Sequence, residues 1–119
     1  MLSRADAQHF ADEWIAAWNS HDLDRILAHY TEDIEFTSPF IVKILNDPSG
    51  TLRGRDKLRA YFGRALAAYP ELHFELHRVC TSVASVVLEY TSINGLHAAE
   101  AMMLTEEGKV RKVWAHYES

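Results

Sequence analysis

Apolar residues recur at helical spacing in three segments of the chain. The first segment follows Ser3, a typical N-cap residue, and predicts a helix over residues 4–19. The second predicts a short helix capped by Asp22, and the third a helix capped by Asp56 and stopped by Pro70. The apolar positions of the three helices are Phe10, Trp14, Ile15 and Trp18; Leu23, Ile26, Leu27 and Tyr30; and Leu58, Tyr61, Phe62, Ala65, Leu66 and Tyr69.

Apolar and polar residues alternate in the remaining segments, which predicts strands. Residues 34–38 form one strand that ends before a proline, and residues 41–54, with the turn sequence NDPSG, are expected to form a short hairpin. Alternation resumes over residues 72–77 and 86–91. The next run, LHAAEAMML, consists of good helix formers, but the preceding Asn-Gly turn favours a strand. After the turn TEEGK, the run VRKVWAHYES predicts a last strand.

The order of these elements predicts an α+β fold. Two helices are followed by a strand or hairpin, a third helix and then four strands, so we expect helices on one face of a curved antiparallel sheet. The length of 119 residues suits one domain, which we expect to span residues 1–119.

Composition narrows the classes of function. The net charge of −5 argues against a nucleic-acid partner, because binding to phosphates needs clustered Lys and Arg. No segment approaches the roughly 20 apolar residues of a membrane helix, and the N-terminal sequence does not resemble a signal peptide, so we expect a cytoplasmic protein without a membrane partner. Cys80 is the single cysteine, and we expect a packed, unreactive thiol.

Three stretches of the chain carry a family resemblance. WIAAWNSHDLDRILAHYTEDIEFTSP, LRGRDKLRAYFGRAL and EEGKVRKVWAHYE resemble the nuclear transport factor 2-like superfamily and, within it, the SnoaL-like polyketide cyclases and ketosteroid isomerase relatives. The resemblance implies a cone in which a strongly curved, mixed or antiparallel sheet wraps three helices and encloses one deep pocket. The pocket wall that it implies is largely apolar and suits a small apolar ligand. Its residues would be Trp14, Trp18, Ser38, Phe40, Tyr61, Phe62, Val86, Leu88, Glu100, Met102, Val113, Ala115 and Tyr117.

The resemblance also assigns positions to a catalytic apparatus. Ketosteroid isomerase relatives carry the proton-shuttling carboxylate just before a proline, where this chain has Ser38, and a hydroxyl is too weak a base for that task. Their oxyanion-binding tyrosine corresponds to Trp14, which offers a single N–H donor. Their second oxyanion donor, an aspartic acid, corresponds to Glu100. Classical steroid isomerisation is therefore not expected.

Glu100 lies among small and apolar residues, in the sequence AAEAMML. If its strand faces the pocket, loss of solvent would raise the pKa of its carboxyl and leave an acid that can protonate a bound carbonyl or ether oxygen. The alternatives are a carboxylate at the pocket mouth or one paired with an arginine. Tyr61 is the hydroxyl that we expect to orient a ligand, together with Trp14 and Ser38.

The last strand has two faces, and alternation decides which residues share one. Trp114, His116 and Glu118 lie on one face and Val113, Ala115 and Tyr117 on the other. We expect the second set to face the pocket. The first set would then lie on the outer sheet face, through which the resemblance implies a homodimer.

Metal and cofactor sites are not expected. His73 and His77 are four residues apart, but on a strand this spacing separates them by about 13 Å, too far for one ion. Two functions remain open. The chain is either a cofactor-independent cyclase, isomerase or lyase with Glu100 as proton donor, or a non-catalytic module for ligand binding or dimerisation.

Overall fold

The computed structural model describes residues 2–118, and in them the predicted α+β arrangement is confirmed. The helices are α1 (Arg4–Ser20), α2 (Leu23–Leu27), α3 (Pro39–Leu45) and α4 (Arg55–Ala68), with a 3₁₀ turn, η1, at Ile93–Gly95. The strands are β1 (Tyr30–Thr37), β2 (Thr51–Arg53), β3 (Glu75–Thr81), β4 (Ser85–Thr91), β5 (His97–Leu104) and β6 (Val110–Tyr117).

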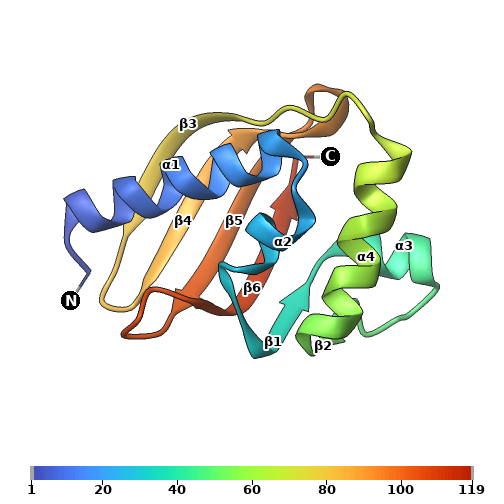
Figure 1. Ribbon diagram of the computed structural model, residues 1–119, viewed down its shortest axis with the longest axis horizontal. Coiled ribbons are helices and arrows are strands. Elements are labelled where there is room, and N and C mark those ends of the chain that lie inside the picture. The colour runs from blue at the N-terminus through green and yellow to red at the C-terminus, as the bar shows by residue number, and fades with distance from the viewer. Residues whose placement is uncertain (1, 119) are drawn as a thin grey trace.

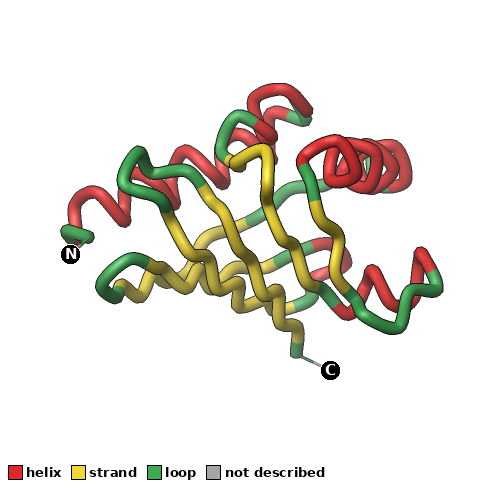
Figure 2. The backbone as a smooth tube through the Cα atoms, turned by 90° about the horizontal axis from the view of Figure 1, so that it is seen from below, coloured by secondary structure: helices red, strands yellow, loops and turns green. Residues whose placement is uncertain are grey.

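The strands form one curved, mixed sheet in the order β2-β1-β6-β5-β4-β3. All neighbouring strands are antiparallel except β1 and β6, which run parallel. Figures 1 and 2 show α1 and α4 on the same side of this sheet, α1 across β3 to β5 and α4 near β1 and β2. The sheet stays open, so the helices and not a closed barrel complete the hollow of the cone.

Aromatic side chains join the helices to the concave sheet face. The ring of Trp14 on α1 stacks on Phe74 with centroids 5.9 Å apart and meets Tyr90 of β4 at 5.3 Å. Trp18, one turn later, meets Phe62 of α4 edge to face at 4.7 Å. Such pairs bury large areas in preferred geometries, so this cluster holds α1 and α4 at a set distance over the sheet.

The prediction of a hairpin over residues 41–54 is wrong in part. A helix that the sequence analysis did not expect, α3, precedes β2. Ser38 is its N-cap, with Oγ accepting a hydrogen bond from the backbone N–H of Phe40 at 3.2 Å, and Pro39 occupies the first turn. Serine before proline is a helix-start signal, since proline lacks the N–H that the first turn leaves unpaired. The strands β1 and β2 do pair antiparallel on either side of α3.

The strand expected over residues 72–77 begins later, at Glu75. The side chain of Asn19 explains the delay, because its Nδ2 donates to the carbonyl of Phe74 at 3.0 Å and its Oδ1 accepts from the N–H of Phe74 at 2.7 Å. Nε2 of His21 lies 2.7 Å from the carbonyl oxygen of Leu72. Side chains at the C-terminal end of α1 thus form the hydrogen bonds with the backbone of Leu72 and Phe74 that a neighbouring strand would otherwise form.

Three smaller expectations also differ from the structure. Tyr30, expected on the second helix, is the first residue of β1, and its side chain is buried. Helix α4 starts after Gly54, whose φ of 97° favours glycine, and Asp56 lies inside its first turn. Cys80 is exposed on β3 and not packed.

In residues 2–118, no helix is long and apolar enough to span a membrane.

Candidate functional site

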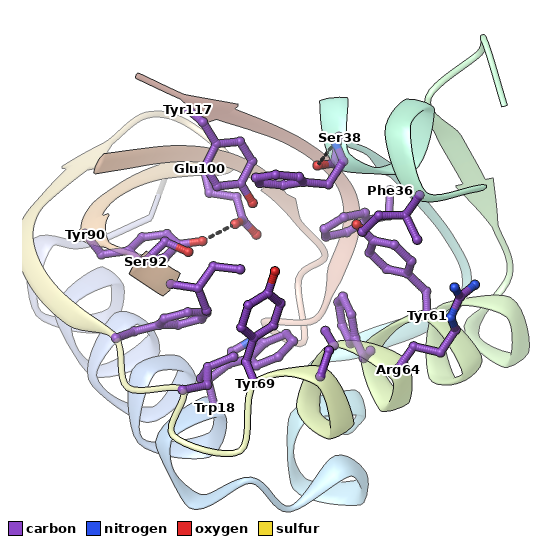
Figure 3. Close-up of a pocket in the computed structure, with 18 of the residues that line it drawn as sticks. Trp18, Phe36, Ser38, Tyr61, Arg64, Tyr69, Tyr90, Ser92, Glu100 and Tyr117 are labelled. Carbon is purple, nitrogen blue, oxygen red and sulfur yellow. Dashed lines mark hydrogen bonds between the residues drawn. The ribbon is translucent and has the colours of Figure 1, made fainter. Parts of the chain in front are cut away.

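A cavity of about 320 Å³ lies between α4, α3 and one end of the concave sheet face (Figure 3). Eight residues expected in the pocket wall line it: Trp14, Trp18, Ser38, Phe40, Tyr61, Phe62, Glu100 and Tyr117. Eleven others line it as well: Phe36, Ile44, Arg64, Ala65, Ala68, Tyr69, Leu72, Phe74, Tyr90, Ser92 and Ile93. The wall is therefore mainly apolar, with hydroxyl groups and two charged residues set into it.

The strand register explains which sheet residues reach the cavity. Three cross-strand rows cover the concave face of β4, β5 and β6, and they are Val86, Met102 and Val113; Leu88, Glu100 and Ala115; and Tyr90, Ala98 and Tyr117. Tyr90, Tyr117 and Glu100 border the cavity, whereas Ala98 and the other residues of these rows are buried core. The five residues expected in the wall that do not line it are Val86, Leu88, Met102, Val113 and Ala115.

Glu100 is the buried carboxyl of the site, with 3% of its surface exposed. Leu88 and Ala115 flank it in register, so its neighbours across both strands are apolar. This burial raises the pKa of the Glu100 carboxyl to about 7, although the hydrogen bond from Tyr90 acts in the opposite direction. Glu100 therefore exchanges a proton near neutral pH.

Tyr90 holds one of the two carboxyl oxygens. Its hydroxyl donates to Oε1 of Glu100 at 2.6 Å, a short bond (Figure 3). No residue from 2 to 118 donates a hydrogen bond to Oε2, so this oxygen can exchange a proton with a bound molecule. Burial and the nearby Glu100 charge raise the pKa of Tyr90 well above its ordinary value, so Tyr90 keeps its proton and stays a donor.

Further phenol groups surround the carboxyl. Tyr117 of β6 lies diagonal to Glu100 in the sheet, and Tyr69 points into the cavity from the end of α4 (Figure 3). Burial raises the pKa of Tyr117, and the Glu100 charge raises it further. Burial also raises the pKa of Tyr61, while the Ser38 side chain lowers it. Neutral hydroxyl donors are thus available beside the one carboxyl.

Ser38 lines the cavity but serves the backbone. Its Oγ caps α3 by accepting the N–H of Phe40, and its own N–H donates to the carbonyl of Gly50 at 2.9 Å. A hydroxyl in this position positions α3, and no His, Asp or Glu side chain among residues 2–118 forms a hydrogen bond with it. The structure therefore offers no proton-abstracting group at the place where ketosteroid isomerase relatives carry a carboxylate.

Trp14 uses its single donor inside the core. Its Nε1–H donates to the Tyr30 hydroxyl at 3.0 Å, and both side chains are about 1% exposed. The indole N–H is therefore not available to an oxyanion in the cavity. Trp14 contributes its ring face to the wall, while the N–H of Trp18 is buried without a partner among residues 2–118.

Sequence reasoning did not find Tyr90, the direct partner of Glu100. Alternation places Tyr90 on the same face of β4 as Val86 and Leu88, so the sequence alone indicates that its side chain points into the core. Its distance from Glu100 follows from the β4–β5 register, which depends on the 3₁₀ turn η1 that the Asn94-Gly95 pair forms. The contact of Glu100 with Tyr90 is therefore a tertiary feature.

Stability should depend on pH through Glu100. The pKa of its carboxyl is about 7 in the folded protein and 4.5 when unperturbed, as in the unfolded chain. Between these pH values the folded protein therefore binds more protons than the unfolded chain does. The free energy of unfolding is then highest below pH 4.5 and falls as the pH rises through 7. Relative to a Glu100→Gln variant, the native protein should lose about 2–3 kcal/mol between pH 5 and pH 8, as measured by urea unfolding.

Glu107→Gln provides the matched control for this measurement. Glu107 lies exposed in the turn between β5 and β6, and its replacement removes the same formal charge. Its unfolding free energy should follow that of the native protein at every pH. An equal pH dependence in the Glu100→Gln variant and in the native protein would show that Glu100 is ionised at pH 5.

The structure places no metal centre within residues 2–118, where no three His, Cys, Asp or Glu side chains converge.

On β6, Val113 and Ala115 are buried and Trp114 is 37% exposed, which assigns the faces of this strand. Nδ1 of His116 lies 3.0 Å from the carbonyl oxygen of Trp114, away from the cavity lining.

Solved structures share this architecture. A SnoaL-like protein of unknown function from Burkholderia thailandensis is 43% identical, and the match covers 99% of this chain and 98% of that chain with a TM-score of 0.96. SalBIII, described as an epoxide hydrolase/cyclase-like enzyme in pyran ring formation in polyether salinomycin, is 21% identical, with coverages of 99% and 95% and a TM-score of 0.79. A candidate ketosteroid isomerase from Kribbella flavida is 15% identical, with coverages of 95% and 78% and a TM-score of 0.74.

The last two likenesses concern the fold, since their sequence identities are low. No functionally curated protein matches the chain. The family model described as SnoaL-like domain matches residues 11–117, nearly the whole chain, and the Burkholderia relative agrees with it in sequence as well as in shape. This protein therefore belongs to the SnoaL-like domain family.

Proposed function

We propose that this protein is a cofactor-independent acid–base enzyme of the cyclase, isomerase or lyase type. Its substrate is a small apolar compound with a carbonyl or ether oxygen, and Glu100 is the proton donor. The observation that carries the proposal is the Glu100 carboxyl, which lies in a largely apolar cavity and has a pKa of about 7. An acid with a pKa near the working pH is present in both protonation states, as general acid–base catalysis requires.

The proposed step uses Glu100 in both forms. The protonated carboxyl gives its proton to the carbonyl oxygen of the substrate, and the resulting carboxylate takes a proton from the carbon beside that carbonyl. A C–H bond breaks, an O–H bond forms and the acid is regenerated. Tyr90 donates to Oε1 of Glu100 throughout and stabilises the carboxylate. The phenol group of Tyr117 orients the reacting oxygen, and that of Tyr61 orients the rest of the substrate.

The apolar surroundings of the carboxyl favour an acid–base enzyme. Trp18, Phe36, Phe62 and Phe74 form much of the wall, and an apolar substrate would displace water from it. Low polarity strengthens the hydrogen bonds of the site and keeps a large fraction of Glu100 protonated near neutral pH. The cyclase and isomerase descriptions of SalBIII and the Kribbella flavida protein belong to the same reaction class.

A non-catalytic ligand-binding module is the alternative, and one observation favours it. Ser38 stands at the position of the relatives' base and is engaged as the cap of α3. Binding in the cavity needs only the apolar wall, whereas catalysis needs Glu100 to meet a substrate oxygen. The two functions therefore differ in what the carboxyl does once a ligand is bound.

Solvent exchange separates the two functions without knowledge of the product. Small cyclic and aryl ketones are incubated with the protein in D₂O, and loss of the proton signal beside the carbonyl is followed by proton NMR. The enzyme proposal expects at least one ketone to exchange faster than in buffer. Ketones that bind, as seen by line broadening, but exchange at the buffer rate throughout the set would favour the binding module.

We further propose a homodimer through the outer sheet face. Val87, Ala101 and Trp114 form one cross-strand row on this face, which is apolar over three strands. Trp114 is 37% exposed, with the Nζ of Lys112 5.5 Å from its ring centroid. Large aromatic side chains in such positions are typical anchors of protein interfaces.

Trp114→Glu should therefore convert the dimer to a monomer, because it puts a charge into the middle of the apolar row. Light scattering coupled to size exclusion should show the mass of the native protein halved. Val83→Glu is the control, since Val83 is 69% exposed in the turn between β3 and β4, away from this row. A native protein of monomer mass would refute the homodimer.

A further inference from the structure

Arg64 is a cationic residue at the rim of the cavity that the reaction proposed above does not use. Arg64 and Glu100 are the charged residues that line the cavity within the described part of the chain. Other arginines of α4 are occupied, since Arg59 pairs with Asp24 at 2.8 Å and Arg55 donates to the carbonyl of Tyr30. Arg64 forms no ion pair with any residue from 2 to 118. Its guanidinium is free to bind an anion at the cavity mouth.

Tyr61 provides a second donor beside it. The two side chains are three residues apart on α4, so they leave the helix on the same face. Burial raises the pKa of the Tyr61 hydroxyl, and the charge of Arg64 is the smallest of the contributions that act on it, in the lowering direction. A guanidinium and a neutral hydroxyl together match the oxygens of a carboxylate or a sulfonate.

The two charged residues lie at separate places in the cavity. Figure 3 shows Arg64 on the α4 side and Glu100 across the cavity, on the sheet. The rest of the wall is mainly apolar and includes Phe62, Ala65 and Ala68. An anionic group would be repelled at the Glu100 end when that carboxyl is ionised and attracted at the Arg64 end, so the polarity of the cavity selects the orientation of a ligand.

We propose that the natural ligand is an apolar monoanion whose carboxylate or sulfonate binds Arg64 and Tyr61 at the rim. Its apolar body fills the cavity, and its neutral carbonyl or ether oxygen reaches Glu100. This substrate class rests on the proposed function for the role of Glu100, but the anion site at Arg64 does not depend on catalysis. An apolar acid with a second, uncharged oxygen is thus the compound class to expect.

Two fluorescent probes with the same apolar body test the anion site. 8-Anilinonaphthalene-1-sulfonate carries a sulfonate, and N-phenyl-1-naphthylamine is the same framework without it. Arg64→Gln should weaken binding of the sulfonate about 5-fold, the upper range for an exposed charge pair, and leave binding of the neutral amine unchanged. Arg64→Lys should restore part of the lost affinity, because it returns the charge without the planar fork.

Arg59→Gln is the matched control. It removes the same charge from the same helix, and Arg59 does not line the cavity. The inference is overturned if Arg64→Gln leaves the sulfonate affinity unchanged, weakens both probes equally, or has no larger effect than Arg59→Gln. Failure of the neutral amine to bind the native protein would overturn the apolar ligand as well. Probe selectivity that depends on Arg64, in a protein that exchanges no ketone proton, would support the anion site and reject the enzyme.

Discussion

Glu100→Gln is expected to lower the rate of ketone proton exchange by about 10²–10⁴-fold, the usual contribution of a positioned acid or base. The amide is nearly the same size as the carboxyl and can still accept the Tyr90 hydrogen bond, so the cavity keeps its shape. What it loses is a group that changes protonation state near pH 7. The measurement is the initial rate of deuterium incorporation by proton NMR, at equal protein concentration and fixed pH.

Two further variants decide whether the loss belongs to the carboxyl. Glu100→Asp keeps an acid but draws it back by one methylene, so we expect a rate between those of the native protein and Glu100→Gln. Glu107→Gln, at the exposed turn, should exchange at the native rate. A Glu100→Gln protein that binds N-phenyl-1-naphthylamine and still exchanges at the native rate would remove Glu100 from the mechanism.

The parts of the fold that follow from local pattern were predictable from the sequence. Strand β5 is the clearest case. Its residues favour a helix by propensity, but the preceding Asn94-Gly95 turn indicates a strand, and the structure has a strand there. Alternation also separates Val113 and Ala115 from Trp114 on β6, and the structure shows the first two buried and Trp114 37% exposed. In both cases the evidence lies within a few residues of the element it describes.

Tertiary contacts decided the segments where the expectations were wrong. Phe74 leaves the expected strand because Asn19, 55 residues away in the sequence, takes both of its backbone hydrogen bonds. The helix α3 was signalled locally by Ser38 and Pro39, but the same serine also suited the end of a strand. Its role as a helix cap explains why this position holds a hydroxyl, whichever function the cavity has.

The candidate site divides in the same way. Glu100 is identifiable from the sequence as a carboxyl among apolar residues, and the structure decides between the alternatives left open, because the side chain is 3% exposed. Tyr90 and Arg64 were not, because the first depends on strand register and the second on how α4 is set against the sheet. The two cavity residues that the sequence pattern does not identify are therefore those placed by tertiary contacts.

Trp14→Ala should lower the free energy of unfolding by about 4 kcal/mol, the middle of the range for removing a buried large aromatic side chain. Trp14 is 1% exposed and contacts the rings of Trp18, Phe74 and Tyr90, so the vacated space has little chance to close. Urea unfolding at pH 6 measures the change. Val83→Ala is the surface control, and at 69% exposure it should cost less than 1 kcal/mol, about the size of other surface changes.

A double-mutant cycle then isolates the hydrogen bond from the packing. Trp14→Phe and Tyr30→Phe each remove one partner of the 3.0 Å bond and leave the other polar group buried, whereas the double variant removes both. The two single losses should therefore exceed the loss in the double variant when summed, with a coupling of about 1 kcal/mol. Strict additivity would mean that the indole N–H does not depend on Tyr30. It would then be free to turn toward a ligand, and Trp14 would return as a candidate oxyanion donor.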